Sequence, residues 1–161
     1  MTQFIGTNLP PDLLERFTPE NLPHYAHKVV LIVTVGEDGY AHPAMLSHFE
    51  IVARDARILR LATYCDSRTT SNVRRTGRLT VLVIDEGTAY YVQGHVEEIK
   101  PHMTAAPYNT LLELRVEKVM ADHADAAREG DARITGGITY ADSHLNEKIA
   151  RAGVVFAEML M

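Results

Sequence analysis

The stretch that decides the fold of this chain runs ILRLATYCDSRTTSNVRRTG, from Ile58 to Gly77. Its first part is apolar apart from Arg60 and predicts a short strand. The small and polar residues that follow predict a turn, and the segment from Ser67 to Thr76 predicts a short helix. Gly77 can end that helix, because glycine accepts the left-handed conformation of a helix C-cap.

A strand that enters a helix through a polar turn favours the binding of an anion. The first backbone N–H groups of a helix lack partners, and the helix dipole attracts negative charge to them. Asp66 or Ser67 can cap this N-terminus, and Arg68 offers a planar guanidinium suited to phosphate. Hydroxyl donors come from Ser67, Thr69, Thr70 and Ser71. The stretch therefore predicts a phosphate site.

The charge distribution supports this hypothesis. Residues 54–78 contain seven arginines and two aspartates, a local charge of +5 in a chain whose net charge is −5. The same pattern also fits an ordinary surface helix with solvated arginines, and the sequence alone leaves both interpretations open.

The bulk composition indicates one globular domain, residues 1–161, with 46% hydrophobic and 23% charged residues. The mild acidity argues against a general nucleic-acid binder. The lone cysteine, Cys65, excludes an intrachain disulfide framework and a thiolate zinc cluster, and it suits a reducing, cytoplasmic location. We see no signal peptide and no apolar run of membrane-spanning length, so no membrane association is expected.

Six short strands are predicted along the chain. The β-branched run Val29–Val35 predicts a buried strand, and Asp38-Gly39 predicts the hairpin turn after it. Pro43 in the second strand indicates either an edge position or a position whose missing N–H faces no partner. The remaining strands are expected at residues 40–51, 58–63, 78–84, 89–99 and 110–116.

Two irregularities are expected in the later strands. Gly94 predicts a bulge or a close approach of another group, and the broken alternation at Glu117 predicts a second bulge. Residues 143–160 have apolar side chains at helical spacing, with Ser143 as the expected cap and an apolar last turn that needs a cover. Short connections between mostly antiparallel strands favour a small β-barrel over a parallel α/β sheet.

This pattern resembles the flavin-binding split barrel of the pyridoxamine 5′-phosphate oxidase superfamily, over residues 28–100. The strongest part is Thr63-x-x-x-Ser67-Arg68, which is similar to the phosphate-binding turn of that family. The resemblance implies a mainly β fold, a six-stranded antiparallel split barrel with a C-terminal helix. It also implies a homodimer with flavin mononucleotide (FMN) between the subunits.

The resemblance implies cofactor contacts in two places. Thr63 and the backbone of Ala44, Met45, Leu46 and Ser47 would place the flavin ring, and Ser67 and Arg68 would hold the phosphate, with Thr69 as a further cofactor contact. The true oxidases carry an arginine where Ala44 stands, a lysine where Thr69 stands, and a C-terminal substrate segment with tryptophan, which this chain lacks. The resemblance therefore implies an FMN-dependent oxidoreductase with an unknown small-molecule substrate, not a true pyridoxamine phosphate oxidase.

Several alternatives stay open at this stage. A non-catalytic protein that stores or senses flavin or haem fits the same fold, and a deazaflavin can replace the flavin. His48, Tyr64 and His95 are candidate substrate contacts, but each also fits a packed or surface position. Cys65 fits either a reactive thiol or a turn-filling residue. His24 and His27 share a predicted helix face, but the sequence places no third ligand, so no metal site is predicted.

Overall fold

The computed structural model describes residues 1–161 as one curled antiparallel sheet with flanking helices. The strands are β1 (Thr2–Gly6), β2 (Val29–Val35), β3 (Ala41–Ser47), β4 (Ile51–Asp55), β5 (Ile58–Tyr64), β6 (Arg78–Asp85), β7 (Thr88–Lys100) and β8 (Asn109–Asp122). The helices are α1 (Pro11–Arg16), α2 (Leu22–Tyr25), α3 (Arg68–Thr76), α4 (Ala126–Glu129) and α5 (Leu145–Leu160). Two short 3₁₀ helices, Pro19–Asn21 and His48–Glu50, complete the chain.

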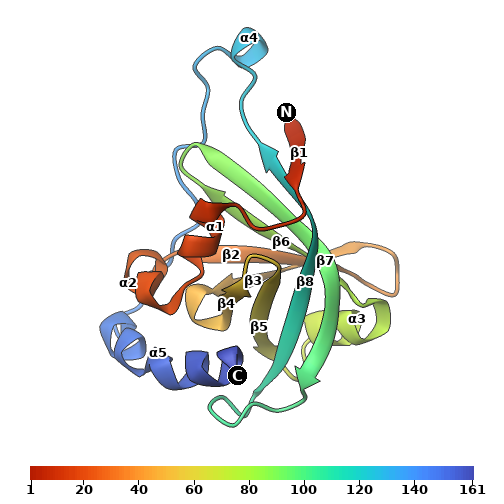
Figure 1. The fold of residues 1–161 in the computed structure, drawn as a ribbon, viewed down its shortest axis with the longest axis vertical. Coiled ribbons are helices and arrows are strands. Elements are labelled where there is room, and N and C mark those ends of the chain that lie inside the picture. Colours follow the sequence, from red (N-terminus) through yellow and green to blue (C-terminus); the bar gives the residue numbers. More distant parts are fainter.

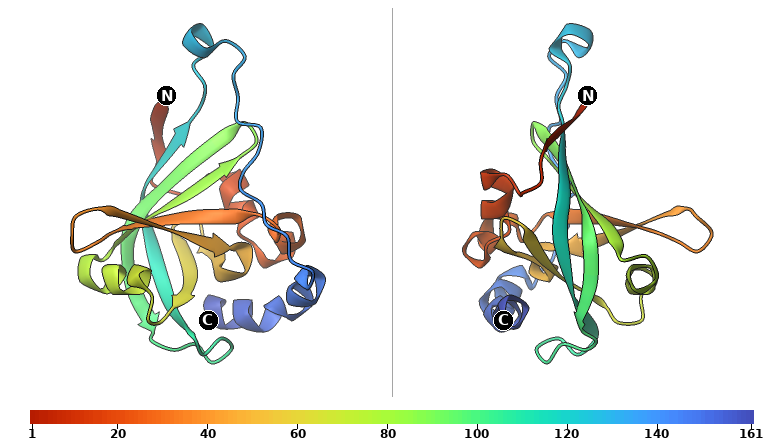
Figure 2. Two further views of the ribbon diagram at one scale, coloured as in Figure 1. Left: turned by 180° about the vertical axis from the view of Figure 1, so that it is seen from behind. Right: turned by 45° about the vertical axis from the view of Figure 1, so that its right-hand side comes forward.

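Seven strands follow one another across the sheet in the order β3-β2-β6-β7-β8-β5-β4, and β1 pairs with β8 outside this path. The sheet curls so that β4 and β5 approach β2 and β3 across the core (Figure 1). Helices α1, α2 and α5 lie on one side of the sheet, α3 on the other, and α4 at the tip of an excursion away from the barrel (Figure 2). The expected mainly β barrel fold is confirmed, but the expected count of six strands is wrong.

Two features explain the difference in strand number. The exposed segment Thr2–Gly6 adds β1 along β8, although it has no apolar alternation. The expected strand 40–51 is interrupted after Ser47, because the Glu50 carboxylate accepts hydrogen bonds from the Ser47 N–H at 2.8 Å and from its hydroxyl at 2.9 Å. This capping box starts the 3₁₀ turn and separates β3 from β4.

The predicted irregularities are confirmed. Pro43 lies in β3, an edge strand of the sheet. Gly94 lies at a register shift between β7 and β8, where a Cβ would meet the Arg115 carbonyl oxygen at 2.0 Å, so only glycine fits. Across from it, Glu117 is the extra residue between the paired positions Val116 and Lys118.

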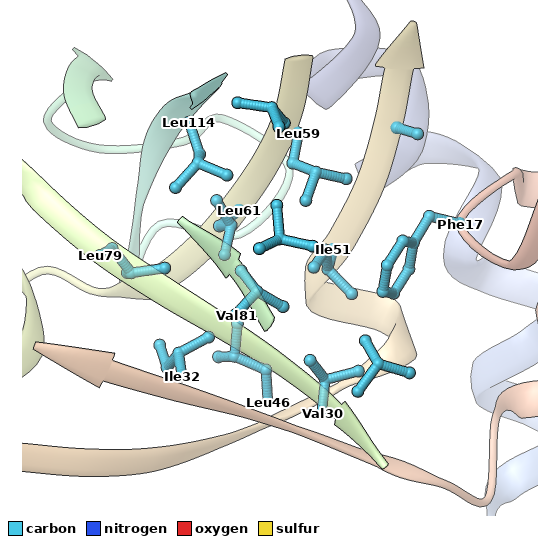
Figure 3. Close-up of a cluster of buried hydrophobic side chains, with 14 of the residues drawn as sticks. Phe17, Val30, Ile32, Leu46, Ile51, Leu59, Leu61, Leu79, Val81 and Leu114 are labelled. Atoms are coloured by element: carbon cyan, nitrogen blue, oxygen red, sulfur yellow. The ribbon is translucent and has the colours of Figure 1, made fainter. Parts of the chain in front are cut away.

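The barrel encloses one large apolar cluster. Inward side chains of β2, β5, β6 and β8 fill it, and Phe17 closes one end (Figure 3). Leu59, Leu61 and Leu114 are fully buried there. Alternation along each strand therefore decides which face turns inward.

Helix α5 covers a second, smaller cluster. Phe156 and Met159 pack in one cluster with Val52 of β4 and Ala62 of β5. Glu158, also buried, accepts hydrogen bonds from Lys100 and from the amides of Thr104 and Ala105. Burial alone would raise the pKa of Glu158, but these donors outweigh it and lower the pKa to about 2. The apolar end of the helix is thus covered within the chain.

The start of α5 differs from the prediction. The helix begins at Leu145, with His144 at the cap position and no side-chain cap. Asp142 accepts the His144 N–H at 2.9 Å just before the helix, and Ser143 does not cap it. In α2, which ends at Tyr25, the chain leaves the helix before His27, so His24 and His27 share no helix face. No helix is both long and apolar enough to cross a membrane.

A buried polar network ties α1 to the sheet. His48 is 3% exposed; its Nδ1 donates to the Lys28 carbonyl oxygen at 3.0 Å and its Nε2 accepts from Arg16 at 3.1 Å. Arg16 and Lys28 both donate to Asp85, at 2.8 and 2.6 Å. Burial and the neighbouring Arg16 charge lower the pKa of His48 from 6.5 to about 4. His48 is therefore a packed residue, held neutral in the fold.

This network predicts a pH dependence of stability. Between pH 6.5 and about 4, His48 takes up a proton in the unfolded chain but not in the folded one. The free energy of unfolding should fall by about 3 kcal/mol as the pH is lowered through this range. His48→Phe should lack this contribution, which urea denaturation of both proteins at a series of pH values would measure. Equal pH slopes for the two proteins would contradict the burial of a neutral histidine.

Candidate functional site

The stretch from Ile58 to Gly77 folds as the sequence predicts. Ser67 caps helix α3, because its hydroxyl accepts the Thr70 N–H at 3.1 Å. Gly77 ends the helix with φ of 63°, and its N–H donates to the Val73 carbonyl. The strand, the turn and the helix are thus positioned by local signals.

A cluster of hydroxyl groups fixes the turn between β5 and α3. The buried Thr70 hydroxyl donates to the Tyr64 carbonyl at 2.7 Å and bonds to the hydroxyls of Ser67 and Thr63, at 3.1 and 2.7 Å. Thr63 and Thr69 are each 4% exposed. Both threonines therefore face the interior, and Thr63 positions the turn through Thr70.

The N-terminus of α3 opens into a cavity of about 770 Å³, which we call the α3 cavity. One wall is the hairpin between β2 and β3, and the other is the start of the helix. The lining residues are Gly36, Glu37, Asp38, Tyr40, Ala41, His42, Asp66, Ser67, Arg68, Ser71 and Asn72. Asn72 anchors the helix to the hairpin side, because its amide donates to the Thr34 hydroxyl at 3.0 Å.

Arg68 is the one arginine or lysine that lines the α3 cavity. The other arginines expected to form a cluster are dispersed. Arg74 pairs with Glu98 at 2.6 Å, Arg75 donates to the Val35 carbonyl, and Arg60 pairs with Glu113 at 2.7 Å in the sheet. Arg60, Arg74 and Arg75 are therefore engaged in contacts within the chain and are not available to a ligand.

Two donors at the helix start remain without partners. The N–H groups of Arg68 and Thr69 make no hydrogen bond within the chain, whereas those of Thr70 and Ser71 bond to Ser67. Three acidic residues, Glu37, Asp38 and Asp66, stand on the cavity rim, but the Asp38 carboxylate accepts the Tyr40 N–H at 3.1 Å. A dianion such as phosphate would meet these two N–H groups and the Arg68 guanidinium at the α3 end of the cavity.

The four residues expected along a flavin ring divide between two faces of β3. Ala44 and Leu46 turn inward and pack on the core, whereas Met45 is 66% exposed and Ser47 half-buried. The Ser47 N–H donates to Glu50 and not to β2. In an antiparallel ladder, residues two apart along a strand point their backbone N–H and C=O groups to the same side, and Met45 is two residues from Ser47. The N–H and C=O of Met45 therefore face the open edge of the sheet.

The three candidate substrate contacts have different environments. His48 belongs to the buried network described above. His95 is half exposed, 3.5 Å from Glu97, and lies next to Gly77 at the far end of α3. Tyr64 is 62% exposed at the end of β5, beside the cap of α3. Only Tyr64 lies near the α3 N-terminus.

Cys65 is partly buried in the turn itself. Its thiol donates to the Pro101 carbonyl at 3.1 Å and lies 3.2 Å from His102 Nδ1. These contacts tie the turn to the β7–β8 loop.

Sequence analysis missed the hairpin side of the site. Tyr40, His42 and Asn72 line the α3 cavity, but only the tertiary fold brings residues 36–42 next to residues 66–72. No local pattern in the sequence predicts that these two segments lie side by side.

The family model described as pyridoxamine 5′-phosphate oxidase matches residues 19–135 of this chain. The uncharacterized protein YclD of Bacillus subtilis (strain 168) is 32% identical over 101 residues. The match covers 63% of this chain and 66% of YclD, slightly less than two thirds of that relative.

Solved structures share the fold at low sequence identity. A candidate pyridoxamine 5′-phosphate oxidase from Lactobacillus delbrueckii has a TM-score of 0.58 at 18% identity, covering 74% of this chain and 98% of that chain. An FAD-binding protein from Mesorhizobium loti has a TM-score of 0.51 at 14% identity, covering 78% and 99%. Because the family model spans β2 to β8 and the whole β5–α3 turn, the chain belongs to the pyridoxamine 5′-phosphate oxidase family.

Proposed function

We propose that this protein binds FMN between the α3 N-terminus and the open edge of β3, as a flavin-dependent oxidoreductase. The observation that carries the proposal is the α3 cavity, which Arg68 and Ser71 line at the start of a helix whose first two amides, those of Arg68 and Thr69, have no partner within the chain. Family membership and an FAD-binding structural relative support a flavin. A bound flavin supplies electron-transfer chemistry, and the protein supplies binding and orientation.

The residues present fit the two ends of such a cofactor. The guanidinium of Arg68 and the amides of Arg68 and Thr69 would hold the phosphate, because charge-assisted hydrogen bonds favour a dianion at a helix start. The exposed backbone of Met45 on β3 would meet the polar edge of the ring. Strand β3 is seven residues long and spans about 20 Å from its first to its last residue. It therefore offers the ring an extended strand edge to lie along.

We do not extend this function to pyridoxamine 5′-phosphate oxidation. The family resemblance places an arginine at the position of Ala44 and a lysine at that of Thr69 in the true oxidases. Here Ala44 packs on the core and Thr69 is buried, so neither can replace those charges. Arg68 is left as the principal cation for the phosphate.

We also propose a homodimer, formed through the outer face of the sheet. One row of apolar side chains crosses five strands on that face: Met45, Leu31, Leu82, Tyr91 and Met120. None of the five is fully buried. Met45 is exposed and the other four are half-buried, so the row leaves apolar surface in contact with water, as is typical of an interface. Because Met45 also borders the proposed ring site, a second copy seated there would help to close it.

Substitution of Arg68 tests the phosphate site. Arg68→Ala should weaken FMN binding about 10- to 150-fold, because a hydrogen bond to a charged group contributes roughly 1.5–3 kcal/mol. Riboflavin has the same ring without the phosphate, so its affinity should barely change. Fluorescence titration with both ligands measures the contrast.

The matched control is Arg57→Ala. Arg57 is exposed at the opposite end of β5, and its side chain makes no ion pair. This variant should bind both ligands like the unmodified protein. Equal losses for FMN and riboflavin in Arg68→Ala, or no loss for either, would rule out phosphate binding at this helix.

A charge in the middle of the apolar row tests the dimer. Leu82→Lys should shift the protein from dimer to monomer in sedimentation experiments, because the interface would bury an unpaired ammonium. Glu15→Lys, on the exposed side of α1, introduces an ammonium away from this face, with an even larger change in net charge, and should remain dimeric. If the unmodified protein is a monomer at all accessible concentrations with flavin bound, the interface does not exist.

A further inference from the structure

A second cavity, of about 450 Å³, lies at the other end of β3, and we call it the α5 cavity. Its lining comes from five parts of the chain: the end of β3, the 3₁₀ turn, the end of β5, the segment before α5, and α5 itself. The lining residues are Ser47, Phe49, Glu50, Tyr64, Tyr140, Lys148, Arg151, Ala152 and Val155. Its size suits a small organic molecule.

The floor of the α5 cavity is apolar and rigid. Phe49 and Val155 pack on the buried cluster beneath α5, to which Ala152 also belongs. Such a floor binds a flat apolar surface by removing it from water. The same cluster holds the helix against β4 and β5.

Two tyrosines form the walls. Tyr64 ends β5, and Tyr140 is fixed because its hydroxyl donates to the Ala26 carbonyl at 2.8 Å. The backbone around Tyr140 is held as well: the Tyr140 N–H donates to His27, and the Val29 N–H donates to Ile138. Aromatic side chains at two walls favour a planar ligand.

The charges at the rim favour an anion. Lys148 is paired with Asp142, whereas Arg151 is exposed and makes no ion pair or hydrogen bond within the chain. Glu50 is the one carboxylate in the lining, and its Oε2 is taken up by the Ser47 N–H and hydroxyl. Arg151 is thus the cation free to meet a ligand.

The position of this cavity links it to the proposed flavin site. Ser47 ends the strand along which the ring would lie, and Tyr64 directly precedes the turn that leads to the phosphate end. Tyr140, Lys148 and Arg151 lie beyond residues 19–135, the part that matches the family model. The shared fold would hold the cofactor, and the C-terminal part of this chain would select the substrate.

We propose that the α5 cavity binds the substrate of this protein, a small planar compound with one anionic group that Arg151 recognises. The role of this ligand as a substrate rests on the proposed flavin site. The anion site itself is argued from the cavity and its lining alone.

The probe that tests it is 2-naphthoate, a planar carboxylate, with 2-naphthamide as its neutral counterpart of the same shape. Calorimetric titration of the flavin-loaded protein should show tighter binding of the naphthoate. Arg151→Gln should weaken naphthoate binding about 10- to 100-fold and leave naphthamide unchanged. Arg128→Gln, an exposed arginine on the remote α4, should behave like the unmodified protein. Naphthoate should also shift the absorption spectrum of the bound flavin.

Three results would overturn the inference: no naphthoate binding at millimolar concentration, equal affinity in Arg151→Gln and the unmodified protein, or binding that leaves the flavin spectrum unchanged. Naphthoate binding that leaves the flavin spectrum unchanged would show that the cavity is not a substrate site beside the flavin. Arg151-dependent naphthoate binding to a protein that takes up no flavin would instead uphold the anion site and reject the flavin function. The two failures are therefore distinguishable.

Discussion

The position of helix α3 depends on the buried Thr70 hydroxyl. This one oxygen meets the hydroxyls of Thr63 and Ser67 and the carbonyl of Tyr64, so the end of β5, the turn and the helix cap share a single polar centre. Buried hydroxyls without partners are costly, and a complete set of partners therefore specifies one geometry. With the turn fixed, the start of α3 lies across the α3 cavity from the hairpin between β2 and β3.

The site then follows from an open sheet edge. Strand β3 pairs only with β2, and its outer edge carries the free backbone groups of Met45. One cavity lies at its Ala41 end and another at its Ser47 end. The edge, usually a liability for aggregation, would be covered here by a cofactor and by a second subunit. In the proposed arrangement β3 would supply the edge along which the ring lies, α3 the anion site and α5 one wall of the substrate site.

Sequence reasoning succeeded where a residue acts on its neighbours. The Ser67 cap, the Gly77 stop, the edge position of Pro43 and the bulge at Gly94 are all set by local chemistry. It failed where distant partners decide. The arginines of residues 54–78 looked like one positive patch, but Arg60 and Arg74 are paired with glutamates of β8 and β7. The break after Ser47 had a local signal, Ser47 followed by Glu50, which the expectation of one long strand concealed.

The central claim is that the β3 edge and the α3 N-terminus together hold FMN. The visible absorption spectrum of the purified protein, followed by mass measurement of any released pigment, tests it most directly. The account predicts flavin absorption bands and a pigment with the mass of FMN, or the appearance of those bands when FMN is added to colourless protein. A colourless protein that changes neither the absorbance nor the fluorescence of FMN at micromolar concentration would contradict it.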